Sequence, residues 1–180
     1  LYPGTGFENE IGEDMGEGFT VNVPLPTGAD DEVFLRAIDR VVTPAVEKFA
    51  PTAVITIIGT DGHRSDPGSG LNFTNNGLSD AMERIREYSN HLLLLAGGGY
   101  DLRSTTRGWT RMWGTANRMD ALPDYLLVMG GAFVSSADLQ GGDLVDMTYR
   151  VSGKEKEEMV AEVDRIVAYP EAKTLPLIGR

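Results

Sequence analysis

The spacing of hydrophobic residues alternates along this chain between continuous apolar runs and the spacing of an amphipathic helix. The runs Ala53–Gly59 and His91–Leu95 are typical of strands buried on both faces of a parallel sheet. Helical spacing follows each run and predicts one helix after Thr74 and another over about 102–117. Strands and helices therefore alternate.

The segment before these runs adds one more strand and one more helix. Phe19–Leu25 alternates apolar and polar residues like a strand and is interrupted by prolines. Asp30 is a good N-cap for a helix that runs to about Phe49. Pro44 should kink or restart that helix because proline has no N–H to donate. Residues 1–18 are rich in glycine and acidic residues and are predicted to form a long loop.

The order strand–helix, repeated, predicts the α/β class: a parallel sheet with helices on both faces, in three layers. Three strands make a small sheet with an open edge, so partner strands are expected upstream. The chain also starts within a loop and without methionine, and we interpret it as the later part of a longer polypeptide. After Asp120 the pattern weakens to a short candidate strand at 125–129 and a helix at 154–168. We predict a single domain over 1–180, with residues 121–180 as a C-terminal extension that covers a sheet edge or forms a subunit contact in a homo-oligomer.

Composition excludes several classes of function. The formal charge of −11 over 180 residues argues against nucleic-acid and anionic membrane partners. The chain has no cysteine, which excludes disulfides and thiol nucleophiles. No apolar stretch approaches the roughly 20 residues that span a bilayer, and a cytoplasmic location is the default expectation.

The candidate chemistry lies where the two buried strands end. The turn Gly97-Gly-Gly-Tyr100 follows one strand and Asp61 follows the other. Carboxyl ends of neighbouring parallel strands meet at one edge of a sheet, where ligands bind. Tyr100 could donate a hydrogen bond there and Asp61 could hold a metal. A purely structural turn, a capping role for Asp61 and a phosphate cradle at the glycines remain alternatives.

The chain's histidines do not complete a metal site. A catalytic zinc needs about three protein ligands, and the only histidines are His63 and His91. His63 lies close enough to Asp61 in sequence to share a metal, although a solvated position is the simpler interpretation. His91 opens a strand and is interpreted as structural, and Asp66 before Pro67 as a turn former.

Several motifs in order resemble the histone deacetylase superfamily, which includes acetoin-utilisation proteins and acetylpolyamine amidohydrolases. They cover roughly residues 1–117. The motifs are Tyr2-Pro-Gly-Thr-Gly6, Val21-Asn-Val-Pro24, Asp61 to Asp66-Pro67, Leu71-Asn-Phe-Thr74, Gly97-Gly-Gly-Tyr100 and Arg107-Gly-Trp109.

The resemblance implies an arginase-like α/β fold and metal-dependent, typically zinc-dependent, removal of acetyl groups from acetyl-lysine, acetylpolyamine or a related amine. It assigns Asp61 as a metal ligand and Tyr100 as the donor to the developing oxyanion. Tyr2 corresponds to a wall of the acyl tunnel and Gly97, Gly98 and Gly99 to its floor. Phe19 matches a position whose carbonyl serves a structural monovalent cation.

The resemblance also implies what this chain lacks. The other two metal ligands and the histidine general base should lie upstream of Leu1, in the missing N-terminal part of the same domain. The chain alone is therefore expected to be inactive. A deacetylase-like module without catalysis, for binding or assembly, is the alternative.

Overall fold

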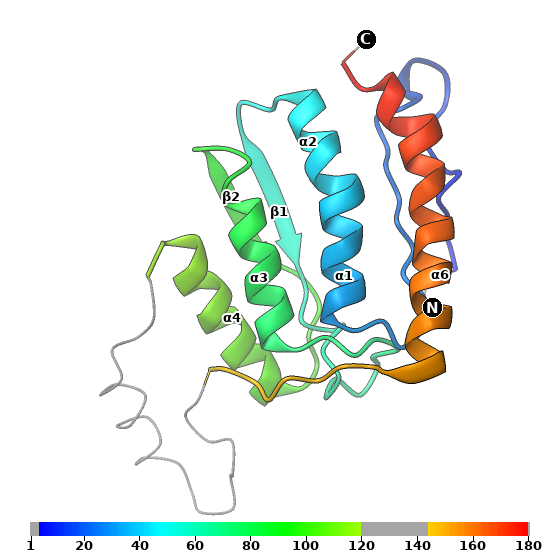
Figure 1. Ribbon diagram of the computed structural model, residues 1–180. Helices are drawn as coiled ribbons and strands as arrows, with labels where there is room; N and C mark the ends of the chain where they lie inside the picture. The colour runs from blue at the N-terminus through cyan, green and yellow to red at the C-terminus, as the bar shows by residue number, and fades with distance from the viewer. Residues whose placement is uncertain (1–3, 120–143, 180) are drawn as a thin grey trace, which may run out of the picture.

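The computed structural model describes residues 4–119 and 144–179, and Figure 1 shows their arrangement. Helices α1 (Asp31–Ala37), α3 (Asn75–Ile85) and α4 (Leu102–Ala116) lie side by side, with the strands β1 (Val54–Ile58) and β2 (Leu92–Ala96) behind them. Helix α6 (Gly153–Tyr169) packs against α1 on the side away from α3. The chain thus has the predicted α/β architecture with a parallel sheet.

The first long helix is divided as Pro44 predicts. Asp30 caps α1 by accepting a hydrogen bond from the Val33 N–H at 3.1 Å. A π-helical turn, η2 (Ile38–Val42), follows, and α2 (Thr43–Phe49) begins with Pro44 in its first turn. Because proline cannot donate to the preceding turn, the helix restarts there.

The two strands pair in parallel, with Val54 opposite Leu92 and Ile58 opposite Ala96. Leu92, Leu94 and Ile58 pack against the hydrophobic core on the helical side. On the other face Ile55 and Ile57 are each 67% exposed and Leu93 is 51% exposed. The expectation that both faces of these strands are buried is wrong for the part of the chain that the structure describes: its helices cover one face.

No strand forms at Phe19–Leu25, so this sequence expectation is wrong. Val21, Val23 and Leu25 are nevertheless partly buried and pack against the core. Their alternation therefore reflects side chains that turn inward from an irregular segment. Pro24 and Pro26 remove the N–H groups that a sheet ladder needs.

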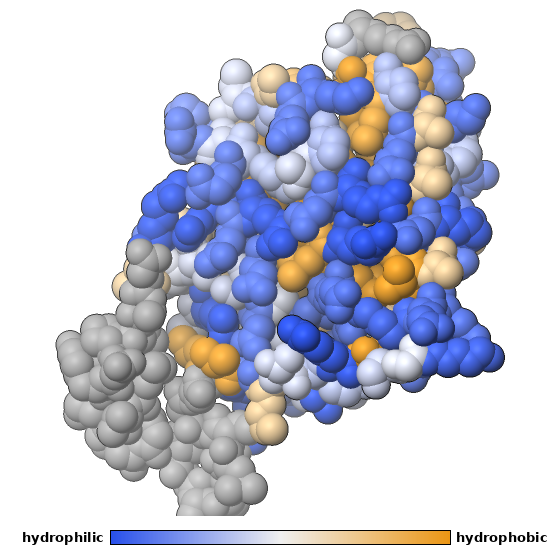
Figure 2. Space-filling view, viewed as in Figure 1, coloured by the Kyte–Doolittle hydropathy of each residue, from blue (hydrophilic) through white to orange (hydrophobic). Residues whose placement is uncertain are grey.

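The core lies between α1, α3, α4 and α6 and is filled mainly by aliphatic residues and methionine. Its most buried large side chains are Val33, Val41, Leu78, Met82, Met112, Val163 and Val167. Figure 2 shows that the outer surface of these helices is largely hydrophilic, with limited hydrophobic areas between them. None of the described helices is long and apolar enough to cross a membrane.

The C-terminal part is fastened to α1 by ion pairs. Lys156 donates to both carboxylate oxygens of Asp30, at 2.8 and 3.0 Å. Burial raises the pKa of Asp30, but the hydrogen bonds from Lys156 and from backbone N–H groups outweigh it and lower the pKa overall. Arg36 pairs with Asp164 at 2.8 Å. The turns η3 (Pro170–Thr174) and η4 (Leu175–Leu177) follow α6. The candidate strand at 125–129 lies outside the described residues.

Candidate functional site

The carboxyl ends of β1 and β2 bring the Asp61 loop and the Tyr100 turn together. Beyond the strands the parallel pairing continues, with Gly97 N–H donating to Ile58 O at 3.2 Å and Thr60 N–H donating to Gly98 O at 2.6 Å. The two backbones therefore stay side by side until Asp61 on one and Tyr100 on the other. This is the juxtaposition that the sequence predicts.

The close approach of the two backbones is possible because the residues of the turn are glycines, which have no Cβ. A Cβ on Gly97 would lie 2.7 Å from Gly59 N, and a Cβ on Gly98 would overlap the Asp61 carboxylate. Gly99 has φ +151°, and a Cβ there would overlap Thr60 Oγ1. The three glycines thus carry the turn against the Asp61 loop, and the Asp61 carboxyl lies beside Gly98.

The two reactive side chains at this edge are open to solvent. Tyr100 is 74% exposed, and Asp61 is exposed as well. The structure gives neither the Tyr100 hydroxyl nor the Asp61 carboxylate a hydrogen bond to another described residue. A carboxylate with free oxygens fits a divalent metal as one ligand. Within residues 4–119 and 144–179 no group of three or more histidine or carboxylate side chains surrounds a point, so these residues do not supply a complete metal site.

Asp66 joins the Asp61 loop to the Tyr100 turn. Its side chain is buried, and Oδ2 accepts hydrogen bonds from the N–H groups of Tyr100 at 2.6 Å and Asp101 at 3.2 Å. Oδ1 accepts from Gly68 N–H at 3.1 Å, which is the turn-forming bond that the sequence predicts. The two longer-range bonds have no signal in the sequence.

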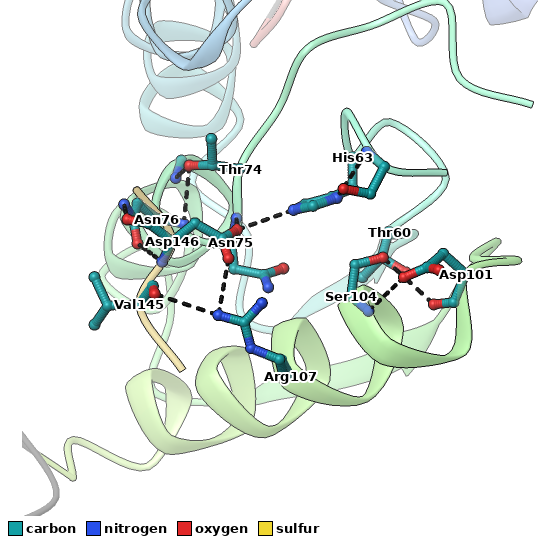
Figure 3. A network of polar contacts seen from close by, with 12 residues as sticks. Thr60, His63, Thr74, Asn75, Asn76, Asp101, Ser104, Arg107, Val145 and Asp146 are labelled. Carbon is teal, nitrogen blue, oxygen red and sulfur yellow. Dashed lines mark hydrogen bonds and ion pairs between the residues drawn. The ribbon is translucent and has the colours of Figure 1, made fainter. Parts of the chain in front are cut away.

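His63 is neither solvated nor available to a metal, so both sequence interpretations of it are wrong. It is 3% exposed, and its Nε2 lies 2.9 Å from Oδ2 of Asp146 (Figure 3). Its Nδ1 accepts the Ser65 N–H at 3.1 Å, so Nε2 carries the proton that is donated to Asp146. Both ring nitrogens are engaged in holding the loop.

Asp146 is the centre of the network in Figure 3. Besides His63, it accepts the Asn75 N–H at 2.7 Å and pairs with Arg107 at 2.9 Å. Burial raises the pKa of Asp146, but the hydrogen bond from His63, the Asn75 N–H and the Arg107 charge outweigh it and lower the pKa to about 2. Asn76 also bonds the Asp146 backbone, donating to its O at 2.8 Å and accepting its N–H at 3.1 Å. The C-terminal extension is therefore anchored on the Asp61 loop, α3 and α4.

The sequence offered no specific signal for Asp146. It lies between weakly patterned segments, and a carboxylate in such a place reads as a solvated charge. Arg107 belongs to a sequence motif, but the partial burial that calls for an anionic partner is known only from the structure.

The other residues singled out from the sequence lie away from the carboxyl ends of β1 and β2 or outside the described residues. Tyr2 is outside the described residues. Phe19 is 76% exposed in the N-terminal loop, and its cation-binding role stays a prediction. His91 stands at the opposite, amino end of β2, where its Nδ1 contacts Thr52 O at 3.1 Å.

The fold and the site together define an α/β protein with its candidate ligand residues at the carboxyl ends of parallel strands. Residues 1–116 match the family model described as the histone deacetylase domain. Because the match covers more than half of the 180 residues, the chain belongs to the histone deacetylase domain family.

Individual relatives agree with this assignment. The chain is 37% identical over 107 residues to a probable deacetylase of Archaeoglobus fulgidus, covering 57% of this chain and 30% of that protein. It is 35% identical over 119 residues to the acetoin utilization protein AcuC of Staphylococcus aureus, covering 63% of this chain and 31% of that protein. Histone deacetylase 1 of Homo sapiens is 35% identical over 109 residues, covering 61% of this chain and 23% of that protein.

A solved structure has the same fold. The crystal structure of the HDA15 HD domain superposes with a TM-score of 0.62 at 34% identity, over 64% of this chain and 34% of that one. The chain thus spans about a third or less of the length of these relatives. The arginase/deacetylase-like fold class predicted from the sequence is confirmed.

Proposed function

We propose that this chain is the C-terminal part of a metal-dependent deacetylase that hydrolyses acetylated amines, with acetyl-lysine and acetylpolyamine as the candidate substrates. Family membership and relatives named as deacetylases support the reaction class. The observation that carries the proposal is the juxtaposition of two exposed, unengaged groups, the Asp61 carboxylate and the Tyr100 hydroxyl, on adjoining backbone turns.

Asp61 and Tyr100 have complementary roles in this proposal. Asp61 supplies one ligand to zinc or another divalent ion, which when bound polarises the acetyl carbonyl and activates water. Tyr100 donates its hydroxyl proton in a hydrogen bond to the oxygen that becomes anionic in the transition state. Such a donor is strongest where the charge develops, so it acts on the rate more than on substrate binding.

The rest of the site is proposed to come from a preceding part of the same domain. One carboxylate does not hold a catalytic metal, and a general base for the water is needed. The open face of the sheet, with Ile55 and Ile57 exposed, supports the idea that a further part of the domain packs there. Three further expectations remain predictions. They are the division of the chain into a core over 1–120 and an extension, the cytoplasmic location and the homo-oligomeric state.

The test compares three variants of the complete protein, loaded with zinc, on acetyl-lysine peptide and acetylpolyamine. Tyr100→Phe is expected to keep its metal and lose about 100- to 1000-fold in kcat with little change in KM. Asp61→Ala is expected to lose both metal and activity. Tyr169→Phe, at the far end of α6, is the matched control and should behave as the wild type.

Two results would overturn the proposal. One is a Tyr100→Phe protein with full activity. The other is a wild-type protein that binds zinc but hydrolyses no acylated amine, which would favour the non-catalytic binding module.

A further inference from the structure

A buried carboxylate spans the gap between the two halves of the candidate site. Asp66 is 5% exposed and belongs to the loop that carries Asp61. Its Oδ2 accepts hydrogen bonds from the backbone N–H groups of Tyr100 and Asp101, at 2.6 and 3.2 Å. It therefore holds the residue that bears the proposed oxyanion donor by that residue's own backbone.

Backbone hydrogen bonds hold the turn up to Gly98, and α4 begins after Asp101, so Gly99 and Tyr100 are the part of the turn that needs a further contact. The residues before Tyr100 are glycines without side chains, and Gly99 has φ +151°, a conformation open to glycine. The Tyr100 side chain is 74% exposed and does not pack into the core. Because the side chain makes no packing contact with the core, its hydroxyl keeps one place relative to a metal ligand only if the Tyr100 backbone is anchored.

Asp66 is itself fixed within its loop, so it is a suitable anchor. Its N–H donates to His63 O at 2.8 Å, its carbonyl accepts Ser69 N–H at 3.1 Å, and its Oδ1 accepts Gly68 N–H at 3.1 Å. His63 is in turn held by Asp146 at 2.9 Å. Movement of the Tyr100 turn away from the Asp61 loop would break hydrogen bonds to a buried charged group, which are stronger than bonds between neutral groups.

We infer that Asp66 is a positioning residue that sets the distance between the oxyanion donor Tyr100 and the metal ligand Asp61. The catalytic consequence of this inference rests on the proposed function. The structural part, a carboxylate clamp on the Tyr100 backbone, is independent of it. Asp66 acts through Tyr100 and touches neither substrate nor metal.

The chemistry of the carboxylate explains why asparagine is an informative substitution. Both oxygens of Asp66 accept hydrogen bonds, and all three donors are backbone N–H groups. An asparagine side chain in its place would keep the size but offer only one acceptor atom. In one orientation the NH2 group would face the Tyr100 and Asp101 N–H groups and their bonds are lost. In the other a neutral amide oxygen replaces the charged acceptor, and bonds to a neutral acceptor are weaker. Both orientations therefore loosen the clamp on Tyr100 and Asp101.

The first experiment is a double-mutant cycle on the complete zinc-loaded protein. Asp66→Asn is expected to lower kcat by roughly 10- to 100-fold, as displacement of a catalytic group by about 1 Å does, with KM and bound zinc unchanged. In the Tyr100→Phe background the same substitution should cause no further loss, because no donor remains to be positioned. Thr74→Ala removes the cap of α3 and serves as a control for a general loss of stability, with kcat unchanged.

Two outcomes of the cycle would overturn the inference. Equal losses from Asp66→Asn in the wild-type and Tyr100→Phe backgrounds would show that Asp66 does not act through the hydroxyl. Loss of zinc from Asp66→Asn would show that it supports the Asp61 loop instead.

A second experiment needs no activity and therefore separates this inference from the proposed function. Amide hydrogen exchange of the 180-residue chain, followed by NMR, should show the Tyr100 and Asp101 N–H groups protected in the wild type. In Asp66→Asn the same two groups should exchange about 10-fold faster or more, because their local opening no longer breaks bonds to a carboxylate. The Asn76 and Gly77 N–H groups, which the Thr74 side chain caps, are the internal control. Unchanged protection of Tyr100 and Asp101 would overturn the clamp, whatever the enzyme assays show.

Discussion

His63 Nε2 and Asp146 Oδ2 lie 2.9 Å apart, although 83 residues separate them in the sequence. Both side chains are almost inaccessible, at 4% and 9% exposure. The pair ties the C-terminal extension to the loop that carries Asp61. The extension is therefore part of the scaffold of the candidate site.

The low pKa of Asp146 predicts a dependence of stability on pH. Because its pKa is lowered to about 2 in the folded chain, its contribution is complete above the ordinary carboxyl pKa and is lost as the pH falls from about 5 towards 2. The shift corresponds to about 2 kcal/mol of unfolding free energy. Urea unfolding at a series of pH values should show a loss about 2 kcal/mol larger in the wild type than in Asp146→Asn. Other carboxylates with lowered pKa values, such as Asp30, titrate in both proteins. Glu158→Gln, at an exposed position, should follow the wild type; a parallel curve for Asp146→Asn would contradict the prediction.

Removal of His63 should be much more damaging than removal of His91. His63→Ala leaves the buried Asp146 carboxylate without one of its donors and opens a space in the loop. We expect a loss of about 2–4 kcal/mol in unfolding free energy. His91→Ala, at an exposed position, should change the unfolding free energy by less than about 0.5 kcal/mol. Comparable effects of the two substitutions in urea unfolding would show that the His63–Asp146 contact contributes little.

Gly99→Ala should disrupt the turn for two reasons at once. The φ of +151° is unfavourable for alanine, and the new Cβ would overlap Thr60 and crowd Thr105. A loss of about 2 kcal/mol or more is expected. Gly114→Ala is the matched control, because it lies inside α4 with open space around its Cα and should stabilise the chain by about 0.5–1 kcal/mol. Thermal unfolding of both variants checks the prediction, which fails if Gly99→Ala is as stable as the wild type.

The isolated chain should not hold zinc tightly. The described residues offer Asp61 as a lone candidate ligand, without a cluster of further histidine or carboxylate groups around it. After incubation with zinc and extensive dialysis, metal analysis should find far less than one ion per chain, and no deacetylase activity should be measured. Stoichiometric zinc that survives dialysis would contradict this expectation.

The open face of the sheet should be detectable with a hydrophobic dye. Ile55 and Ile57 are each 67% exposed beside Leu93. Replacement of both isoleucines by threonine keeps β-branched side chains and should lower dye fluorescence of the isolated chain, with little change in unfolding free energy. Ile58, which packs on the core side, is not substituted. Unchanged fluorescence would mean that the dye binds elsewhere.

Elements with local signals could be predicted from the sequence. The caps at Asp30 and Thr74, the restart at Pro44 and the two leucine- and isoleucine-rich strands are where the sequence places them. The juxtaposition of Asp61 and Tyr100 followed from the parallel pairing of those strands. The alternation at Phe19–Leu25 led to the wrong prediction of a strand. Every second side chain can also face the core in an extended segment that pairs with no other strand.

The contacts that hold the site could not be predicted. Asp66 reaches the Tyr100 turn and Asp146 reaches His63 across long stretches of chain. A carboxylate that accepts backbone N–H groups leaves no periodic pattern in the sequence. Such partners are determined by the tertiary fold, and the burial of His63 could be recognised only with Asp146 in place.

The long sequence separation between His63 and Asp146 also sets an order of assembly during synthesis. A ribosome releases β1, the Asp61 loop, β2 and the Tyr100 turn well before residue 146 emerges. Until then His63 lacks the carboxylate that orients its ring, and the ion pair between Arg107 and Asp146 cannot form. The loop with the candidate metal ligand thus acquires its final rigidity only when the C-terminal extension has been made, so a chain cut short before Asp146 would carry every proposed reactive residue of this segment on an unfinished scaffold.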